Sequence, residues 1–293
     1  MELIDTDVLI VGAGAAGMYA SISAAKLNAR VILCDKSLIS RGGATVMAQM
    51  TVAAAIGHQE ADHWTHHLQD TIKSGQELCN ENLSYVLCKN APKKILEMRD
   101  WKTDWANDNA RIRQVLAPGH GIKRCCYVDF LNTGPAVART LRGQVAKLKN
   151  INRVSGLTII DLVIEGNQVI GAIGLNTETG TYVSISAKAI VLAAGGLTQL
   201  FARNSASKNM GGDSHALALR AGANLMDMEF VQFFPIGHLA PRLVGMDPIM
   251  WDPFRYKLGG RLLNDHEEQF MKTMVAKMEM LTRSAVTLQL TPY

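Results

Sequence analysis

The stretch DVLIVGAGAAG, residues 7–17, decides how this chain begins to fold. Residues 7–11 are mostly aliphatic or β-branched and stop at a glycine, a pattern typical of a buried parallel strand. Small residues at helical spacing follow over 15–27, and a second buried strand is predicted over 30–34. Strand, helix and strand at this spacing predict a βαβ unit.

Three glycines form a GxGxxG motif directly after the first predicted strand, at the start of the predicted helix. Gly12 permits the tight turn, Gly14 lets the backbone approach a pyrophosphate, and Gly17 lets the helix pack on the sheet. The N–H groups at the helix N-terminus add a positive dipole end, worth about 0.3–1 kcal/mol per charge. For this motif alone, the alternative is a glycine turn that binds nothing.

Asp35 closes the second predicted strand, where its carboxylate can accept hydrogen bonds from ribose hydroxyls. Loss of such a charge-assisted bond costs roughly 1.5–3 kcal/mol. The same negative charge disfavours a 2′-phosphate, so the pattern favours FAD or NAD over NADP. The motif and the carboxylate together leave FAD and NAD both open.

Further segments predict a mixed α/β chain. The pattern is mostly helical over 61–105, and Glu165-Gly166-Asn167 predicts a hairpin between strands at 159–164 and 169–173. We expect one more strand at 182–185 and a separate strand at 189–194 that runs into glycines. The segment after 237 is less regular and is expected to begin a second domain.

The chain resembles the flavoprotein of the succinate dehydrogenase and fumarate reductase family in an ordered set of motifs. These motifs are residues 7–17, 36–49, 119–124, Asp129, 133–134, 193–196, 211–213, 220–222, 227–229, 260–264 and 279–283. The resemblance implies a Rossmann-like FAD-binding domain over 1–237, with three layers, a parallel sheet and a β-meander. It also implies the beginning of an α+β capping domain over 238–293.

The resemblance further implies that FAD is the cofactor and that its contacts fall on the matching residues here. These are Gly12, Ala13, Gly14, Ala15, Ala16, Gly17, Asp35, Lys36, Ser37, Gly42, Gly43, Ala44, Thr45, Ala194, Gly195 and Asp213. Asp213 is expected at the ribityl chain or the ring edge, and its alternative role is the N-cap of a helix that starts near Ser214. Membrane-bound members tether FAD through a histidine where this chain has Ala44, so we expect noncovalent FAD.

The region matching the family's substrate site departs from the family pattern. Phe234 stands where the family has a substrate histidine, and a Thr-Glu pair that grips a dicarboxylate has no counterpart at 251–254. A phenyl ring cannot hydrogen-bond a carboxylate, so we expect a substrate other than succinate or fumarate. Arg283 falls on the family's active-site arginine, a proton donor; its alternative is a surface helix arginine.

The resemblance implies a FAD-dependent oxidoreductase that moves a hydride between flavin and a small organic acid-like substrate. An iron–sulfur or other electron-transfer subunit would exchange the electrons. The alternative is a non-catalytic subunit that holds flavin or acts as a scaffold in a redox complex. Family members continue beyond Arg283, so we expect a fragment, a closing part supplied from elsewhere, or a naturally shorter protein.

The composition limits the size of the core, the kinds of partner and the cellular compartment that we expect. The chain has 293 residues, 48% of them hydrophobic, enough for one large core or two modest ones. Its net charge of +4 includes no Lys/Arg block, so we expect no nucleic-acid partner. Five cysteines without a CxxC pair indicate free thiols in a reducing compartment and no resident iron–sulfur cluster. No apolar run reaches about 20 residues, so we expect a cytoplasmic protein, or one that is at most held to a membrane by other subunits.

Four histidines are candidate functional residues. His63, His66 and His67 share helical spacing but lack a clear carboxylate companion. We therefore expect no metal site and assign them to an amphipathic or solvent-facing helix. His238 lies four residues after Phe234 and is a weaker candidate for the missing imidazole.

Overall fold

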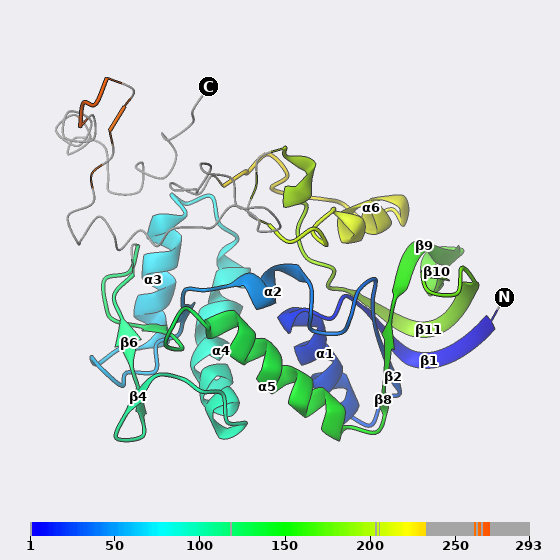
Figure 1. Ribbon diagram of the computed structural model, residues 1–293, viewed down its shortest axis with the longest axis horizontal. Coiled ribbons are helices and arrows are strands. Elements are labelled where there is room, and N and C mark those ends of the chain that lie inside the picture. Colours follow the sequence, from blue (N-terminus) through cyan, green and yellow to red (C-terminus); the bar gives the residue numbers. More distant parts are fainter. Residues whose placement is uncertain are drawn as a thin grey trace. The chain divides into compact units, whose positions relative to one another are not determined.

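The computed structural model describes residues 2–117, 119–202, 204, 206–232, 261, 263–264 and 266–269 (Figure 1). The chain divides into two compact units. Unit 1 comprises Met1–Val52, Lys94–Ala110 and Tyr127–Met226, and unit 2 comprises Ala53–Lys93, Arg111–Cys126 and Asp227–Tyr293. The domain boundary predicted at 237 lies outside the described residues and stays a prediction.

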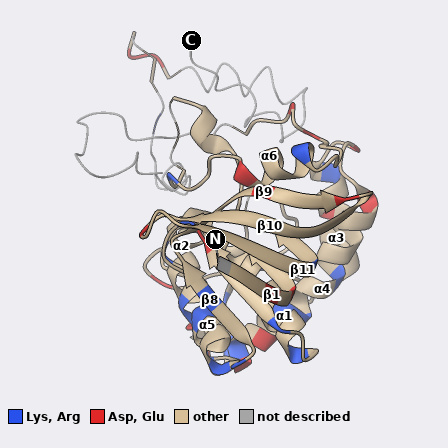
Figure 2. Ribbon diagram, turned by 90° about the vertical axis from the view of Figure 1, so that its right-hand side faces the viewer, with Lys and Arg blue, Asp and Glu red and all other residues tan. Residues whose placement is uncertain are grey.

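A six-stranded sheet forms the centre of unit 1, in the order β8-β2-β1-β11-β10-β9 (Figure 2). The strands are β1 (Glu2–Val11), β2 (Val31–Asp35), β8 (Ile151–Ser155), β9 (Leu157–Glu165), β10 (Gln168–Asn176) and β11 (Tyr182–Leu192). Strands β8, β2, β1 and β11 are parallel, whereas β10 is antiparallel to both β11 and β9. The sheet is therefore a parallel half joined to a β-meander, as predicted.

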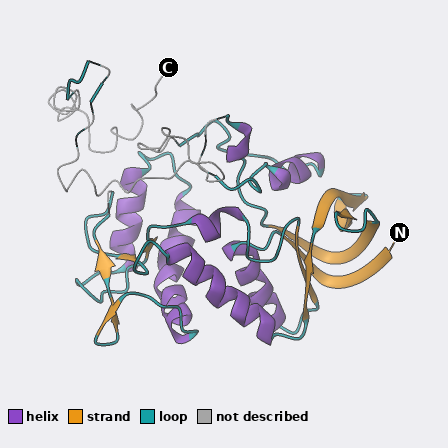
Figure 3. Cartoon of the chain, viewed as in Figure 1, coloured by secondary structure: helices purple, strands orange, loops and turns teal. Residues whose placement is uncertain are grey.

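Helices of unit 1 follow the strands in the order expected of an α/β fold (Figure 3). They are α1 (Ala15–Lys26), α2 (Gly43–Met47), α5 (Thr133–Lys147), the 3-10 turn η1 (Thr198–Leu200) and α6 (Asp213–Arg220). The two-residue strand β4 (Asn107–Asp108) also belongs to unit 1. The predicted βαβ unit is thus confirmed as β1-α1-β2.

Side chains of β1 alternate between two buried faces of the sheet. Leu9 and Val11 join Ile32 and Leu217 in one hydrophobic cluster. The fully buried Ile10 lies on the opposite face, next to Gly17 of α1. Because both faces are covered, the strand has a continuous apolar run instead of an alternating one.

The structure confirms one detail of the predicted strands and corrects another. The hairpin at 165–167 is confirmed, with Glu165 paired to Gln168 across the turn. The two strands predicted at 182–185 and 189–194 are wrong, because β11 is one strand that pairs with β1 from Val183 to Leu192. Residues 186–188 contain neither glycine nor proline, and the parallel ladder carries the strand through them. The sequence prediction also omitted α5 and β8.

Unit 2 is smaller and helical in its described part. It contains α3 (Trp64–Ser74) and the first part of α4 (Glu81–Asp100), which continues into unit 1. Its short strands are β5 (Arg111–Ile112), β6 (Gln114–Val115) and β7 (Cys125–Cys126), and the chain enters it through β3 (Val52–Ala53). No helix in the described part of the chain is long and apolar enough to cross a membrane.

A buried ion network holds unit 2 together. The Arg124 side chain has no solvent exposure; its Nε lies 3.0 Å from Asp62 Oδ2, and its Nη1 lies 2.6 Å from Asp70 Oδ2. The Asp62 side chain is also fully buried. Asp70 Oδ2 additionally accepts a 3.0 Å hydrogen bond from the Gly121 N–H. The network therefore joins the loop around 119–124 to α3 and to the segment before it.

The histidines of α3 divide between the two faces of the helix. His67 is buried, with its ring centroid 5.7 Å from that of His120, whereas His63 and His66 are exposed. This arrangement confirms an amphipathic helix. Among the residues that the structure describes, no three His, Cys, Asp or Glu side chains gather as metal ligands.

Candidate cofactor-binding site

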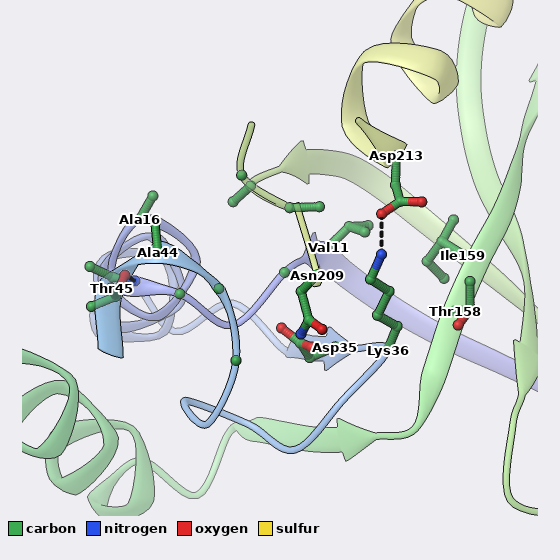
Figure 4. Close-up of a pocket in the computed structure, with 18 of the residues that line it drawn as sticks. Val11, Ala16, Asp35, Lys36, Ala44, Thr45, Thr158, Ile159, Asn209 and Asp213 are labelled. Atoms are coloured by element: carbon green, nitrogen blue, oxygen red, sulfur yellow. Dashed lines mark hydrogen bonds and ion pairs between the residues drawn. The ribbon is translucent and has the colours of Figure 1, made fainter. Parts of the chain in front are cut away.

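A pocket in unit 1 lies where β1, β2 and β11 end (Figure 4). In open α/β sheets, ligands bind in the crevice outside the carboxyl ends of parallel strands. We call it the strand-end pocket. It is lined by Val11, Gly12, Gly14, Ala15, Ala16, Asp35, Lys36, Gly42, Gly43, Ala44, Thr45, Leu157, Thr158, Ile159, Ala193, Ala194, Gly195, Asn209 and Asp213.

Most of the residues predicted to contact the cofactor lie in this lining. Three predicted residues do not line it: Ala13, Gly17 and Ser37. Four stretches far apart in the sequence therefore meet at one place: the glycine turn after β1, the end of β2 with its following loop, the end of β11, and the start of α6. The pocket also receives the first residues of β9.

The floor of the pocket is backbone, because Gly12 brings two strand ends together. Gly12 has a φ of +103°, in the region that favours glycine, and a Cβ there would overlap the carbonyl of Ala193. The Ala193 N–H donates a 2.7 Å hydrogen bond to the carbonyl oxygen of Val11, at the same junction. A Cβ on Gly17 would overlap the Gly12 carbonyl, so this glycine permits the close helix packing that its position in the motif predicted.

The start of α1 presents backbone donors to the pocket. Ala15 N–H donates to Thr45 Oγ1 at 2.9 Å, and Ala13 N–H donates to Asp35 Oδ2 at 2.8 Å. Within the described residues, the N–H groups of Gly14 and Ala16 donate to no acceptor, although both residues line the pocket. Unpaired N–H groups at a helix N-terminus suit an anionic group such as a pyrophosphate.

The carboxylate at the end of β2 is held by three donors. Asp35 Oδ2 accepts the Ala13 hydrogen bond, and Oδ1 accepts from both the N–H and the hydroxyl of Ser37, each at 2.8 Å. An ionised carboxylate has about four acceptor positions, so Asp35 keeps capacity for a ribose hydroxyl. Ala13 and Ser37 therefore position Asp35 without lining the pocket themselves.

An ion pair connects the end of β2 to α6. Lys36 Nζ lies 2.5 Å from Asp213 Oδ2, and both side chains are partly exposed (Figure 4). Asp213 is the first residue of α6, and the N-cap is Gly212, so the alternative role of Asp213 as an N-cap is wrong. The helix begins one residue earlier than expected, which places the carboxylate toward Lys36. The Ser214 hydroxyl instead accepts a 3.0 Å hydrogen bond from Ala194 N–H.

Sequence reasoning missed several lining residues. Leu157, Thr158 and Ile159 come from the start of β9, which follows β8 after Gly156, and Ser155 at the end of β8 pairs with Asp35. Asn209 lies in a loop without a local pattern, and its Nδ2 donates a 2.8 Å hydrogen bond to Ser37 Oγ. No periodicity or spacing signals such a loop contact, although the nearby glycines at 211–212 marked the region.

The residues predicted to act on substrate lie outside the described part of the chain. These are Phe234, His238, the segment 251–254 and Arg283. Their predicted roles therefore rest on the sequence alone.

Comparison with known proteins points in the same direction as the pocket. The sequence profile of the FAD binding domain family matches residues 7–291. An uncharacterised FAD-dependent oxidoreductase of Methanocaldococcus jannaschii is 34% identical over 283 residues, which cover 96% of this chain and 50% of that protein. The succinate dehydrogenase flavoprotein subunit of Rickettsia bellii is 30% identical over 295 residues, covering 97% of this chain and 48% of that subunit.

A solved structure shows the same fold. The quinol fumarate reductase of E. coli superimposes with a TM-score of 0.85 at 29% identity, covering 93% of this chain and 46% of that chain. The chain thus spans about half the length of the curated relatives that it matches.

Proposed function

Since this chain belongs to the FAD binding domain family, alongside the flavoprotein subunits of succinate dehydrogenase and fumarate reductase, we propose that it is the FAD-holding part of an oxidoreductase. FAD is its cofactor. The observation that carries the proposal is the strand-end pocket, which joins unpaired N–H groups, a fixed carboxylate and a backbone floor in one place. These are the groups that an adenine dinucleotide requires.

Each part of the pocket has a role in this proposal. The N–H groups of Gly14 and Ala16 bind the pyrophosphate, and Asp35 binds the ribose of the adenosine. The loop from Gly42 to Thr45 and the residues Ala194 and Gly195 line the path of the cofactor. Asp213, fixed by Lys36, lies toward the ribityl chain or the ring edge.

Bound FAD supplies two-electron chemistry, and the protein supplies position and electrostatics. The proposed reaction transfers a hydride between flavin and an organic acid-like substrate. Phe234 replaces the imidazole of the family pattern, which supports a substrate other than succinate or fumarate. Arg283 is proposed as the proton donor to that substrate.

The proposed mode of FAD binding is noncovalent. Ala44 stands where membrane-bound members of the family carry the tethering histidine, and a methyl group offers no atom for a covalent bond to flavin. Acid precipitation of the purified yellow protein tests this, because noncovalent flavin remains in the supernatant. Flavin that stays in the pellet after washing would contradict it.

A second candidate function is a non-catalytic subunit that holds flavin or acts as a scaffold in a redox complex. Phe234 favours it, because the change removes a substrate contact and leaves the FAD-binding motifs intact. The two candidates differ in one measurement. Under anaerobic conditions, the flavin absorbance near 450 nm bleaches with an organic acid substrate if the chain is an enzyme. Dithionite serves as the control that the flavin is reducible.

Electrons are proposed to pass to or from an iron–sulfur or other electron-transfer subunit. The relatives named as flavoprotein subunits support this proposal. The proposed location is the cytoplasm, with membrane association only through such partners. Purification of the tagged protein from its own cells, followed by metal analysis of the copurifying chains, tests the electron-transfer partner. A flavoprotein that elutes alone, without iron, would contradict the partner.

A further inference from the structure

A second cavity in unit 1 lies beside the loop that lines the strand-end pocket. Its volume is about 540 Å³, and we call it the arginine cavity. It is lined by Ser40, Arg41, Val46, Asp104, Val128, Asn132, Pro135, Ala136, Ala138, Arg139 and Arg142. Residues 42–45 of the same loop line the strand-end pocket, so residues 40–46 contribute to both.

The charges that line this cavity are predominantly positive. Arg139 forms an ion pair with Asp104, which is the only acidic residue of the lining. Among the described residues, the side chains of Arg41 and Arg142 have no carboxylate partner. Figure 2 shows the basic residues of α5, which carries Arg139 and Arg142, as blue segments of its ribbon. Guanidinium groups bind carboxylates in pairs of parallel hydrogen bonds, so two of the three are open to an acidic group from outside.

The loop between two lining residues of the cavity presents an aromatic side chain to solvent. Phe130 is 95% exposed and lies in the chain between the lining residues Val128 and Asn132. Phe130 and Leu131 both have left-handed backbone, with φ of +61° and +57°. This conformation is unfavourable for bulky side chains, by about 1–3 kcal/mol each, and such strain concentrates at binding sites. The loop thus holds a phenyl ring in water, where it gains nothing from packing within unit 1.

These observations favour a protein segment over a small molecule. The Arg139 and Asp104 side chains are 62% and 66% exposed, so a small ligand beside them stays largely in water. Small-molecule sites bury about 70–90% of their ligand. Protein interfaces combine an exposed aromatic residue with arginines at their centre. We infer that the arginine cavity and Phe130 together form a docking site for an acidic segment of a partner protein, with an apolar side chain beside its carboxylates.

The docking site shares the segment 40–46 with the strand-end pocket, and the test distinguishes peptide binding from FAD binding. A fluorescein-labelled hexaglutamate peptide is titrated with the FAD-loaded protein at low ionic strength, and fluorescence anisotropy reports binding. Arg41→Gln/Arg142→Gln is expected to weaken binding at least five-fold. The control Lys149→Gln/Arg153→Gln removes the same charge from exposed positions of unit 1 outside the cavity. This control is expected to change the affinity for the peptide less than two-fold. Equal weakening by both pairs, or no binding to the parent protein, overturns the proposal.

Two further experiments distinguish the possible ligands. Phosphate and succinate, added at matched ionic strength, are expected to leave the peptide bound; complete displacement by either would assign the cavity to a small anion instead. A second peptide, Glu-Glu-Leu-Leu-Glu-Glu, is expected to bind several-fold tighter than one in which both leucines are serines. Phe130→Ser should abolish that gain and leave hexaglutamate binding unchanged. A gain that survives Phe130→Ser contradicts the role of the phenyl ring.

The flavin content of each variant is measured in the same preparations. Loss of flavin from every form, with peptide binding intact, would damage the FAD proposal and leave the docking site standing. Normal flavin content with no peptide binding would overturn the docking site and leave the FAD proposal standing.

Discussion

The two units hold their charged groups in opposite ways. In unit 1, Asp35, Lys36 and Asp213 stay partly exposed around a pocket. In unit 2, Arg124 and Asp62 have no exposure and are paired with each other. A buried ion without its partner is strongly unfavourable, whereas a partly exposed one keeps its water. The buried pair of unit 2 therefore supports its fold, and the charged groups around the pocket of unit 1 remain available to a ligand. Substitutions should accordingly lower stability in unit 2 and cofactor affinity in unit 1.

The largest effect is expected from Arg124→Ala in unit 2. It removes the guanidinium partner of the buried Asp62 carboxylate, which should lower the free energy of unfolding by about 3–5 kcal/mol. Urea unfolding followed by circular dichroism measures it. The control is Lys123→Ala, whose ion pair with Glu60 is exposed, so its loss should change the free energy of unfolding little. Similar losses in both variants would mean that the buried network does not carry the stability of unit 2.

In unit 1, Asp35→Asn should act on the cofactor. Loss of the charge-assisted bond to ribose should weaken FAD binding by about 1.5–3 kcal/mol, roughly 10- to 150-fold. Titration of the flavin-free protein, followed by quenching of FAD fluorescence, measures the change. Asp161→Asn, at an exposed aspartate paired with Arg220, is the control and should bind FAD as the parent does. If Asp35→Asn binds FAD with unchanged affinity, the ribose does not bind at Asp35.

The histidines of unit 2 should make the free energy of unfolding depend on pH. Burial, and then the nearby Arg124 charge, lower the pKa of His67 to about 4, and the same causes lower the pKa of His120. Between about pH 6.5 and pH 4 the unfolded chain binds a proton that folded His67 does not, so the free energy of unfolding falls as pH drops. The slope is at most about 1.4 kcal/mol per pH unit for each histidine.

His67→Phe should flatten this slope and change little near pH 7.5. The buried Nδ1 of His67 has no hydrogen-bond partner among the residues that the structure describes, so a phenyl ring leaves none of their polar groups unsatisfied. Chemical unfolding at a series of pH values measures the slope. His63→Phe, at an exposed histidine whose Nδ1 lies 2.8 Å from Thr65 Oγ1, is the control and should keep the slope of the parent. A parent-like slope in His67→Phe would assign the acid sensitivity to other groups.

The smallest effect is expected from Lys36→Met in unit 1. The ion pair with Asp213 is partly exposed, so its loss should change the free energy of unfolding by about 1 kcal/mol or less. The same urea experiment measures it. A loss as large as that of Arg124→Ala would remove the distinction between the two units.

The parts of the fold that could be predicted are those that depend on residues close together in the sequence. The βαβ unit follows from apolar runs and glycines within 7–34, and the hairpin follows from Gly166 between two strands. The lining of the strand-end pocket was predicted where segments match a family motif, as at Asp35 and 42–45.

The remaining features depend on contacts between distant segments. Leu157 reaches the pocket through the pairing of Ser155 with Asp35, and Asn209 through a loop hydrogen bond to Ser37. The continuity of β11 comes from its ladder with β1, which no window of 182–194 contains. His67 and His66 are adjacent in sequence, yet only the fold determines which of them is buried.

The pairing of β1 with β11 also has a kinetic consequence. Val8 pairs with Ala189, so β1 lacks its neighbour on that side until the ribosome has made β11. At about 5–20 residues per second, that interval lasts roughly 10–35 s. Pairing across such a sequence separation slows folding, and an unpaired apolar strand edge is prone to aggregation. The nascent chain therefore has to keep one edge of β1 away from other chains for the whole time that the intervening segments take to emerge.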